Sequence, residues 1–235
     1  MSTDYFILSK QSDDVRNNDS NNIVVLPNQI SYILPHNLVS CYCERGLFES
    51  GLIEWCKQFC SLDKNMLDIG AHTGTYALSL AKQSKHVYAF EPQKMTYYAL
   101  CGGVALSNLK NITCLNMGLG AESQIGENTL KIISNDGGGS SIHATEGILR
   151  EEKIKIETMD NLQLEDIGFI KMDVEDNELF VLQGAVNTLK QSKYPPILFE
   201  CNEKEANKEL FGFMESLSYK VISVGGVSNM YLACQ

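Results

Sequence analysis

The stretch Met66-Leu-Asp-Ile-Gly-Ala-His-Thr-Gly-Thr-Tyr76 decides the fold of this 235-residue chain. Its first four residues form a short apolar run that is typical of a buried strand. Gly70 to Gly74 is a turn of small residues, and a helix is expected from Tyr76 to Lys82. Gly70 lets the backbone approach a ligand closely, and Gly74 lets the helix pack close to the strand. A strand, a glycine turn and a helix in this order indicate a ligand-binding α/β fold.

The alternation of strand and helix continues along the chain. Further strands are expected at 86–90, 111–116, 169–174, 196–200, 221–224 and 230–233, and helices at 47–59, 95–109, 178–189 and 210–217. The last two strands are expected to form an antiparallel hairpin through Gly225-Gly226. The pattern predicts an α/β, Rossmann-like sheet with seven mostly parallel strands and helices on both faces. Residues 120–160 interrupt the pattern and are expected to be an irregular insertion.

The chain is expected to divide near residue 60. Residues 1–60 are interpreted as an N-terminal extension with short strands and a helix, in which the polar residues 10–22 form a loop. Residues 61–235 are interpreted as a single domain, long enough to bury one sizeable core.

Composition narrows the classes of function. The formal net charge is −10 and the chain has 3 Arg, so it is not expected to grip a long stretch of nucleic acid. Its 8 Cys do not follow the spacing of zinc sites. The first residues are polar, without the apolar core of a signal peptide, and no run of 18 apolar residues suggests a membrane span. A cytoplasmic protein without a membrane partner is expected.

A second acidic position complements the first glycine turn. Glu91 ends the apolar run Val87-Tyr-Ala-Phe90, and an acidic residue at a strand tip can accept both hydroxyls of a ribose. Dinucleotide sites require Gly-x-Gly-x-x-Gly to admit a pyrophosphate, whereas here His72 occupies the middle position. Asp68 adds negative charge, which favours a ligand with a cationic centre. These residues therefore predict S-adenosylmethionine as the cofactor; the alternative is a plain turn followed by a surface acid.

The chain resembles the FkbM-type methyltransferases over about residues 30 to 233. The segments that carry the resemblance are Gly46-Leu-Phe-Glu49, Leu67-Asp-Ile-Gly-Ala-His-Thr-Gly74, Phe90-Glu-Pro92, Gly137-Gly-Gly-Ser-Ser141, Phe169-Ile-Lys-Met-Asp-Val-Glu175, Glu178-Leu-Phe-Val-Leu-Gln-Gly-Ala185 and Ile197-Leu-Phe-Glu200. Two positions depart from the family pattern: Cys101-Gly102-Gly103 stands where Asn is usual, and Asp176 stands where Gly is usual. The resemblance implies that the Rossmann-like sheet is of the class I methyltransferase type. It also implies S-adenosylmethionine-dependent methylation of a hydroxyl on a sugar, a glycan or a small metabolite.

The resemblance and the strand tips together select the cofactor-binding candidates. They are Asp68, Gly70, Ala71, His72, Gly74, Glu91, Pro92, Met117 and Gly118. Met117 and Gly118 are expected to flank the adenine, although an ordinary strand exit is the alternative. His72 and His143 are minor candidates for a base acting on the methyl acceptor.

The catalytic candidates lie at the ends of two neighbouring strands. Lys171, Asp173 and Glu175 end the fourth strand, and Glu200, followed by Asn202, ends the fifth. Carboxylates placed there can act as a general base or hold a divalent cation such as magnesium. As an alternative, the acids from Asp173 to Glu178 favour a helix start through its dipole, and Lys171 extends from its strand for a structural purpose.

Three other functions compete with the leading one. A nucleic-acid 2′-hydroxyl methyltransferase would use the same chemistry but should have a basic surface. A nicotinamide-dependent dehydrogenase is disfavoured because Gly-x-Gly-x-x-Gly is missing. A non-catalytic module that binds S-adenosylmethionine would have no reason to keep the acids at the strand ends. The expected partner is a small-molecule or sugar acceptor, and the oligomeric state is left open, with a dimer as one option.

Overall fold

The computed structural model describes residues 4–10, 29–36, 40, 42, 44, 46–201 and 206–235, so most of the expected loop at 10–22 lies outside the described residues. The strands are β1 (Tyr5–Lys10), β2 (Ile30–Pro35), β3 (Asn65–Ile69), β4 (His86–Phe90), β5 (Ile112–Leu115), β6 (Gly118–Leu119), β7 (Gly126–Ile132), β8 (Arg150–Glu157), β9 (Ile167–Met172), β10 (Ile197–Glu200), β11 (Lys220–Ser223) and β12 (Met230–Cys234). The helices are α2 (Ser50–Cys56), α3 (Thr75–Leu80), α4 (Lys94–Leu106), α5 (Glu178–Gln183), α6 (Val186–Gln191) and α7 (Ala206–Ser216).

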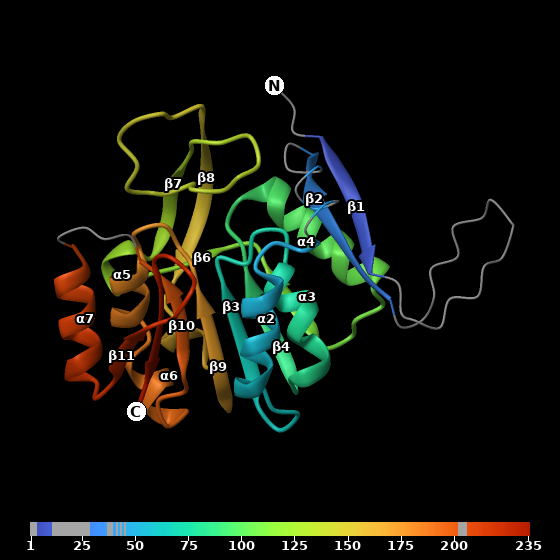
Figure 1. The fold of residues 1–235 in the computed structure, drawn as a ribbon. Coiled ribbons are helices and arrows are strands. Elements are labelled where there is room, and N and C mark those ends of the chain that lie inside the picture. Colours follow the sequence, from blue (N-terminus) through green and yellow to red (C-terminus); the bar gives the residue numbers. More distant parts are fainter. Residues whose placement is uncertain are drawn as a thin grey trace, which may run out of the picture.

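A seven-stranded sheet forms the centre of the molecule (Figure 1). Its strand order is β11-β12-β10-β9-β3-β4-β5. β12 runs antiparallel to both of its neighbours, whereas β10, β9, β3, β4 and β5 pair in parallel. The expected Rossmann-like sheet with an antiparallel closing hairpin is therefore confirmed. Because β3 and β9 lie in the middle, their carboxyl ends meet where the order of connection reverses, which is where ligands bind in such sheets.

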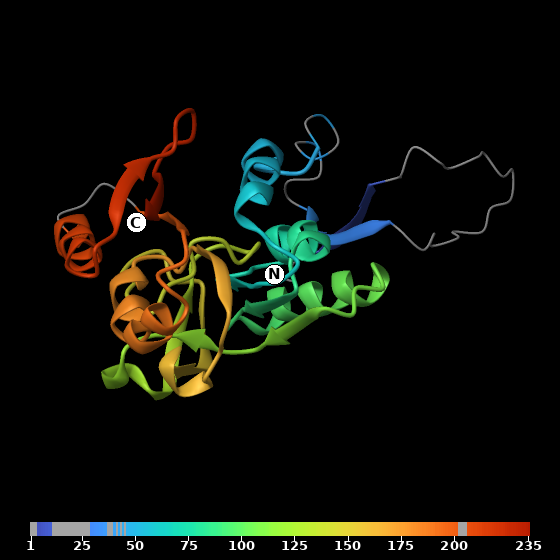
Figure 2. The same ribbon diagram turned by 90° about the horizontal axis from the view of Figure 1, so that it is seen from below.

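Side chains of β3 alternate between the two faces of the sheet. Leu67 and Ile69 join a core with α5, α6 and α7, while Met66 joins a second core with α2, α3 and α4. Figure 2 shows these two groups of helices on opposite sides of the sheet. The alternation places Asp68 on the α3 side, a buried environment with 1% of the residue exposed.

The insertion at residues 120–160 is more regular than the sequence suggested. β7 and β8 pair antiparallel over their length, and β6 joins β8 to complete a three-stranded sheet that rises above the main one (Figure 1). Leu130, Ile132, Ile154 and Ile156 alternate along β7 and β8 and form a core of their own. The expectation of an irregular insertion was wrong for these strands and holds only for the loop between them.

The first two strands pack on helix α4. β1 and β2 form an antiparallel pair, and Tyr32 and Leu34 of β2 join a cluster that includes Leu78 of α3. A Cβ added at Gly102 would lie 2.5 Å from Ile33 Cδ1. At Gly103 it would lie 2.8 Å from Leu78 Cδ1. The glycines that depart from the family pattern thus let β2 approach α4 closely. The division of the chain near residue 60 stays a prediction.

One expected helix is divided in the structure. The segment 178–189 forms α5 and α6 with a break at Gly184-Ala185. A Cβ at Gly184 would lie 2.1 Å from the carbonyl oxygen of Gly120, so the break brings the two backbones into contact. A search of the described residues for a helix that is long and apolar enough to span a membrane finds none.

Candidate functional site

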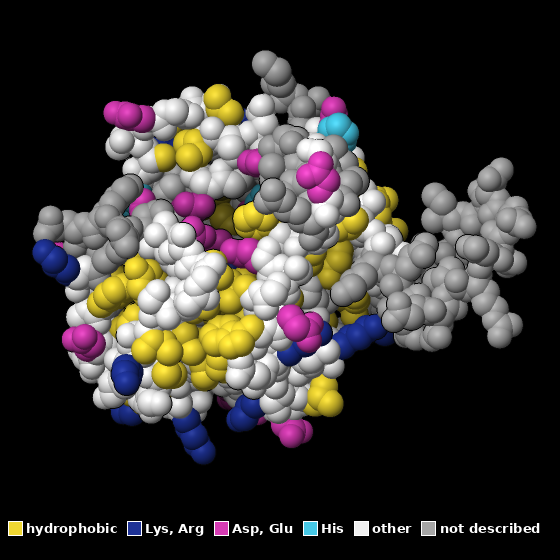
Figure 3. Space-filling view, viewed as in Figure 1, with side chains coloured by type: hydrophobic (Ala, Val, Ile, Leu, Met, Phe, Trp, Pro, Cys, Tyr) yellow, Lys and Arg dark blue, Asp and Glu magenta, His cyan; other side chains and the backbone are white. Residues whose placement is uncertain are grey.

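A cavity of about 330 Å³ lies at the carboxyl ends of β3, β4, β9 and β10. Its wall combines the turn after β3, the end of β4, the loop after β9, the glycine-rich loop 136–142 and side chains of the small sheet. Figure 3 shows Asp and Glu side chains gathered around the hollow in this region. The sheet topology therefore brings the expected strand-end residues to one place.

The cavity wall contains most of the site residues that the sequence predicts. Those that line it are Gly70, Ala71, His72, Glu91, Pro92, Met117, Gly118, Lys171, Asp173, Glu175 and Glu200. Asp68 and Gly74 lie behind the wall, in the layer between β3 and α3. Asn202 lies outside the described residues.

Gly70 joins two strand ends through its backbone. It adopts φ +77°, and its N–H, like that of Ala71, donates to the carbonyl of Phe90. A Cβ at this position would lie 1.8 Å from the carbonyl oxygen of Asp173. Only glycine fits here, because both the positive φ and the close backbone exclude a side chain. The turn is therefore held by packing against the neighbouring strand end.

Asp68 holds the start of helix α3. Its Oδ2 accepts a hydrogen bond of 2.8 Å from the N–H of Ala77, and burial raises its pKa to about 6. Among the described residues, no donor reaches its Oδ1. Asp68 does not line the cavity, so it supports the start of α3 from behind the wall, where the charge of Lys171 lowers its pKa.

Glu91 is buried at the end of β4 and is not the surface acid of the alternative interpretation. Its Oε2 accepts from the N–H of His72 at 2.7 Å. Its Oε1 accepts from the N–H of Gln93 at 2.8 Å and from Thr96 Oγ1 at 2.9 Å. Burial raises the pKa of Glu91, while His72 and these donors lower it. The carboxylate orients the turn after β3, and these three donors leave about one of its four acceptor sites, on Oε2, for a ligand hydroxyl.

Lys171 is a buried cation opposite Asp68 in the register of β3 and β9. Its Nζ lies 3.2 Å from Asp173 Oδ2 and 5.2 Å from the centre of the Tyr76 ring. Burial alone would lower the pKa of Lys171, but the carboxylates of Asp173 and Asp68 outweigh it and the pKa is raised. Lys171 therefore stays charged and orients Asp173 at the cavity wall.

Glu175 anchors the glycine-rich loop above the cavity. Its Oε1 accepts from the N–H of Gly139 at 3.0 Å, and its carbonyl accepts from Ser141 Oγ at 2.6 Å. Both Glu175 and Asp176 have positive φ, 52° and 74°. The left-handed φ at 176 explains why glycine is common there in the family pattern. Glu178 lies in the first turn of α5, as the helix-start interpretation expected. Its Oε1 accepts from the N–H of Val174, which precedes the helix.

Glu200 is a cavity carboxylate whose pKa is raised close to neutrality. Burial raises its pKa to about 7, with further contributions from Asp173, Glu175 and Glu49, while Lys171 lowers it. The carboxylates that line the cavity are those of Glu49, Glu91, Asp136, Asp173, Glu175 and Glu200. Such a wall favours a cationic ligand over a phosphate, so the residues fit S-adenosylmethionine, with its sulfonium and ammonium groups.

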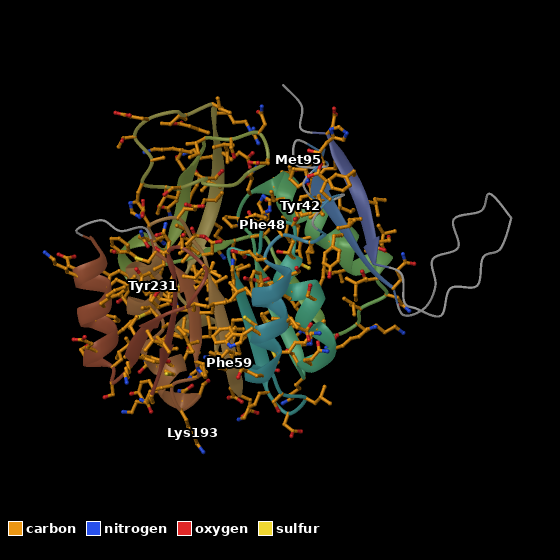
Figure 4. The ribbon with its side chains drawn as sticks, in the orientation of Figure 1. Tyr42, Phe48, Phe59, Met95, Lys193 and Tyr231 are labelled. Carbon is orange, nitrogen blue, oxygen red and sulfur yellow. The ribbon has the colours of Figure 1, made fainter. Side chains whose placement is uncertain are left out.

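Several cavity residues were missed by the sequence. Tyr42, Phe48 and Glu49 line the cavity from the N-terminal segment, and Tyr42 and Phe48 are labelled in Figure 4. Leu130, Ile154 and Ile156 form an apolar wall from the small sheet. A signal for Glu49 was present in Gly46-Leu-Phe-Glu49, but local sequence does not show what this segment contacts.

The two histidine candidates have backbone or side-chain partners. His72 Nε2 donates to the carbonyl of Asp136 at 2.7 Å, which fixes the ring in the cavity wall. His143 Nε2 lies 2.9 Å from Asn177 Oδ1 and its ring stacks on Phe180, outside that wall. Among residues with described positions, no three His, Cys, Asp or Glu side chains gather as a metal site requires. The described residues therefore provide no ligand set for the expected divalent cation.

Comparison with protein families identifies a methyltransferase domain in the chain. A family model described as a methyltransferase FkbM domain matches residues 68–221. No curated protein matches the chain.

Solved structures share the fold at low sequence identity. A methyltransferase FkbM from Methylobacillus flagellatus KT superposes with a TM-score of 0.53 at 20% identity, covering 79% of this chain and 46% of that one. This chain therefore spans less than half the length of that protein. An rRNA methylase from Streptococcus thermophilus has a TM-score of 0.50 at 11% identity, covering 78% and 92% of the two chains. A precorrin-6y C5,15-methyltransferase from Geobacter metallireducens GS-15 has a TM-score of 0.50 at 11% identity, covering 81% and 89%.

Proposed function

Because the chain belongs to the FkbM methyltransferase family, we propose that it methylates a hydroxyl oxygen of a sugar, a glycan or a small metabolite with S-adenosylmethionine as the donor. The observation that carries this proposal is Glu200, a carboxylate with a pKa of about 7 in a cavity that also holds the Lys171–Asp173 pair. A base of that strength is suited to a hydroxyl at neutral pH.

Residues from three strand ends would hold the cofactor. Glu91 would accept from a ribose hydroxyl, and Met117 and Gly118 would flank the adenine. The turn from Gly70 to His72, which Asp68 supports from behind, would face the amino-acid end. The sulfonium of S-adenosylmethionine supplies an activated methyl group when it is bound. Ile154 and Ile156 of the small sheet lie beside Gly118, so this apolar wall would limit the access of water to the adenine side of the cavity.

The chain's own residues would then prepare the acceptor. Glu200 takes the hydroxyl proton onto a carboxylate oxygen, since burial raises its pKa to about 7. Asp173 is held in place by its ion pair with Lys171 at 3.2 Å, so it serves to orient the acceptor by accepting a hydrogen bond.

The charge of the site supports a small acceptor over a nucleic acid. The phosphodiester backbone of a nucleic acid would be repelled by the carboxylates of Glu49, Asp173 and Glu200 at the cavity. The chain as a whole has a formal net charge of −10. Binding to nucleic acid needs clustered cations instead. A neutral or cationic acceptor with a free hydroxyl fits the proposal.

Glu91→Gln is expected to weaken S-adenosylhomocysteine binding by about tenfold or more, because hydrogen bonds to a charged group are lost. Titration calorimetry on the wild type and the variant measures this. Glu122→Gln, with the same change on an exposed side chain, should bind like the wild type. Equal affinity of Glu91→Gln and the wild type would show that Glu91 does not contact the cofactor. If the wild type does not bind S-adenosylhomocysteine, the proposed cofactor is wrong.

Glu200→Gln is expected to lower kcat by about 10²- to 10⁴-fold and to abolish the pH dependence near neutrality. A base must be deprotonated, so the wild-type rate should rise tenfold per pH unit up to about pH 7 and then level off, following the pKa of Glu200. Steady-state kinetics from pH 5 to 9 with sugar and small-hydroxyl acceptors test this. Glu209→Gln, on the exposed face of α7, is the matched control. A rising limb that persists in Glu200→Gln would assign the base to another group.

A further inference from the structure

Glu49 lies outside the region that matches the family model, yet it belongs to the cavity wall. It precedes α2 with a left-handed φ of 55°. Its Oε2 accepts a hydrogen bond of 2.8 Å from the hydroxyl of Tyr76, which is 27 residues further along the chain. The N-terminal segment is thereby tied to the first turn of α3 at the cavity.

Tyr76 connects this contact to the centre of the site. The residue is 3% exposed, and its ring faces Lys171 Nζ at 5.2 Å. Lys171 in turn pairs with Asp173 Oδ2 at 3.2 Å. Four side chains thus follow one another in contact, from Glu49 through Tyr76 and Lys171 to Asp173.

We propose that Glu49 is a positioning residue of the active site, which holds the Tyr76 ring against Lys171 and so keeps Asp173 in place. This inference rests on the proposed function, because the aligned group belongs to the methyl-transfer site. The inference gives Glu49, which lies outside the matched residues 68–221, a role in the reaction.

The hydrogen bond from Tyr76 to Glu49 restricts the positions of two buried groups, the Tyr76 ring and the Lys171 ammonium. The hydroxyl of Tyr76 keeps its proton, because burial and then the charge of Glu49 raise the pKa of Tyr76, so it can only donate to this carboxylate. The hydrogen bond fixes the ring plane, and the ring limits where the Lys171 ammonium can lie. Without it, Lys171 can shift relative to Asp173, and displacements of about 1 Å reduce turnover strongly.

The test is a double-mutant cycle with a conservative rescue. Glu49→Ala removes the acceptor, Tyr76→Phe removes only the donor hydroxyl, and Glu49→Gln keeps an oxygen that accepts from Tyr76. Each of the first two is expected to lower kcat by about tenfold with little change in KM for S-adenosylmethionine. The double variant should be no slower than the worse single variant, and Glu49→Gln should recover most of the rate.

Controls and binding measurements separate the outcomes. Glu54→Gln on α2 and Tyr98→Phe on α4 change exposed side chains of the same types and should match the wild type. Thermal unfolding checks that all variants fold, and calorimetry checks that S-adenosylhomocysteine still binds. Wild-type rates in Glu49→Ala or Tyr76→Phe, additive losses in the double variant, or no recovery in Glu49→Gln would overturn the inference alone. A wild type that neither binds S-adenosylmethionine nor methylates an acceptor would overturn the proposed function and the inference together.

Discussion

Replacing Gly70 with alanine is expected to lower the free energy of unfolding by about 3 kcal/mol or more and to abolish cofactor binding. The added Cβ would lie 1.8 Å from the carbonyl oxygen of Asp173. Neither strand end can move aside easily, because the N–H of Asp173 donates to the carbonyl of Ile69 and the N–H of Gly70 donates to that of Phe90. Urea unfolding of the variant and calorimetry with S-adenosylhomocysteine measure both effects.

Gly126→Ala provides the matched control for this prediction. Gly126 also has a positive φ, of 112°, but a Cβ there has no atom within 4 Å. Its substitution should therefore cost only the backbone strain, about 1 to 2 kcal/mol. If Gly70→Ala loses no more stability than Gly126→Ala, the close approach of β3 and β9 is not what requires glycine at the turn.

Asp173→Asn is expected to lower kcat by about 10³-fold while the protein stays folded. Asparagine keeps the shape of the side chain but removes the charge that pairs with Lys171 at 3.2 Å. Since Lys171 is 5% exposed, the change leaves a buried ammonium with less compensation, and stability should fall by about 1 to 3 kcal/mol. Single-turnover kinetics with the cofactor in excess separate this loss from weaker binding.

Asp176→Asn is the control for Asp173→Asn. It makes the same chemical change three residues away, on an exposed side chain outside the cavity wall. It should turn over like the wild type, and asparagine tolerates the left-handed φ of 74° at this position. A rate for Asp173→Asn within twofold of the wild type would show that Asp173 has no part in the reaction.

The sequence predicted the central sheet well because buried parallel strands are apolar along most of their length. The runs that became β3, β4, β9 and β10 show this, apart from polar residues such as Asp68 and Lys171, and glycines mark the turn after β3. β7 and β8 were missed for the opposite reason. Six of the eight side chains of β8, Arg150-Glu-Glu-Lys-Ile-Lys-Ile-Glu157, are charged, and its alternation becomes meaningful only once β7 supplies a partner.

The same distinction applies to the site. The predicted acids at strand ends meet in the structure because parallel strands deliver their carboxyl ends to one edge, a consequence of topology that sequence can anticipate. Asp68 was placed correctly on the strand, but only the register and the packing of α3 show that it faces Ala77 and lies behind the cavity wall. The cofactor and catalytic roles of these residues stay predictions that the variants above test.

By itself, the sequence determined which segments become buried strands and which acidic side chains end them, because hydrophobic periodicity and glycine placement act over a few residues. Only the tertiary structure decided that Glu49 contacts Tyr76, that the ring faces Lys171, and that burial brings the pKa of Glu200 to about 7. These properties depend on groups far apart in the chain and on the loss of water around them. A short stretch of sequence shows neither how far apart such groups lie in the folded chain nor which of them lose contact with water.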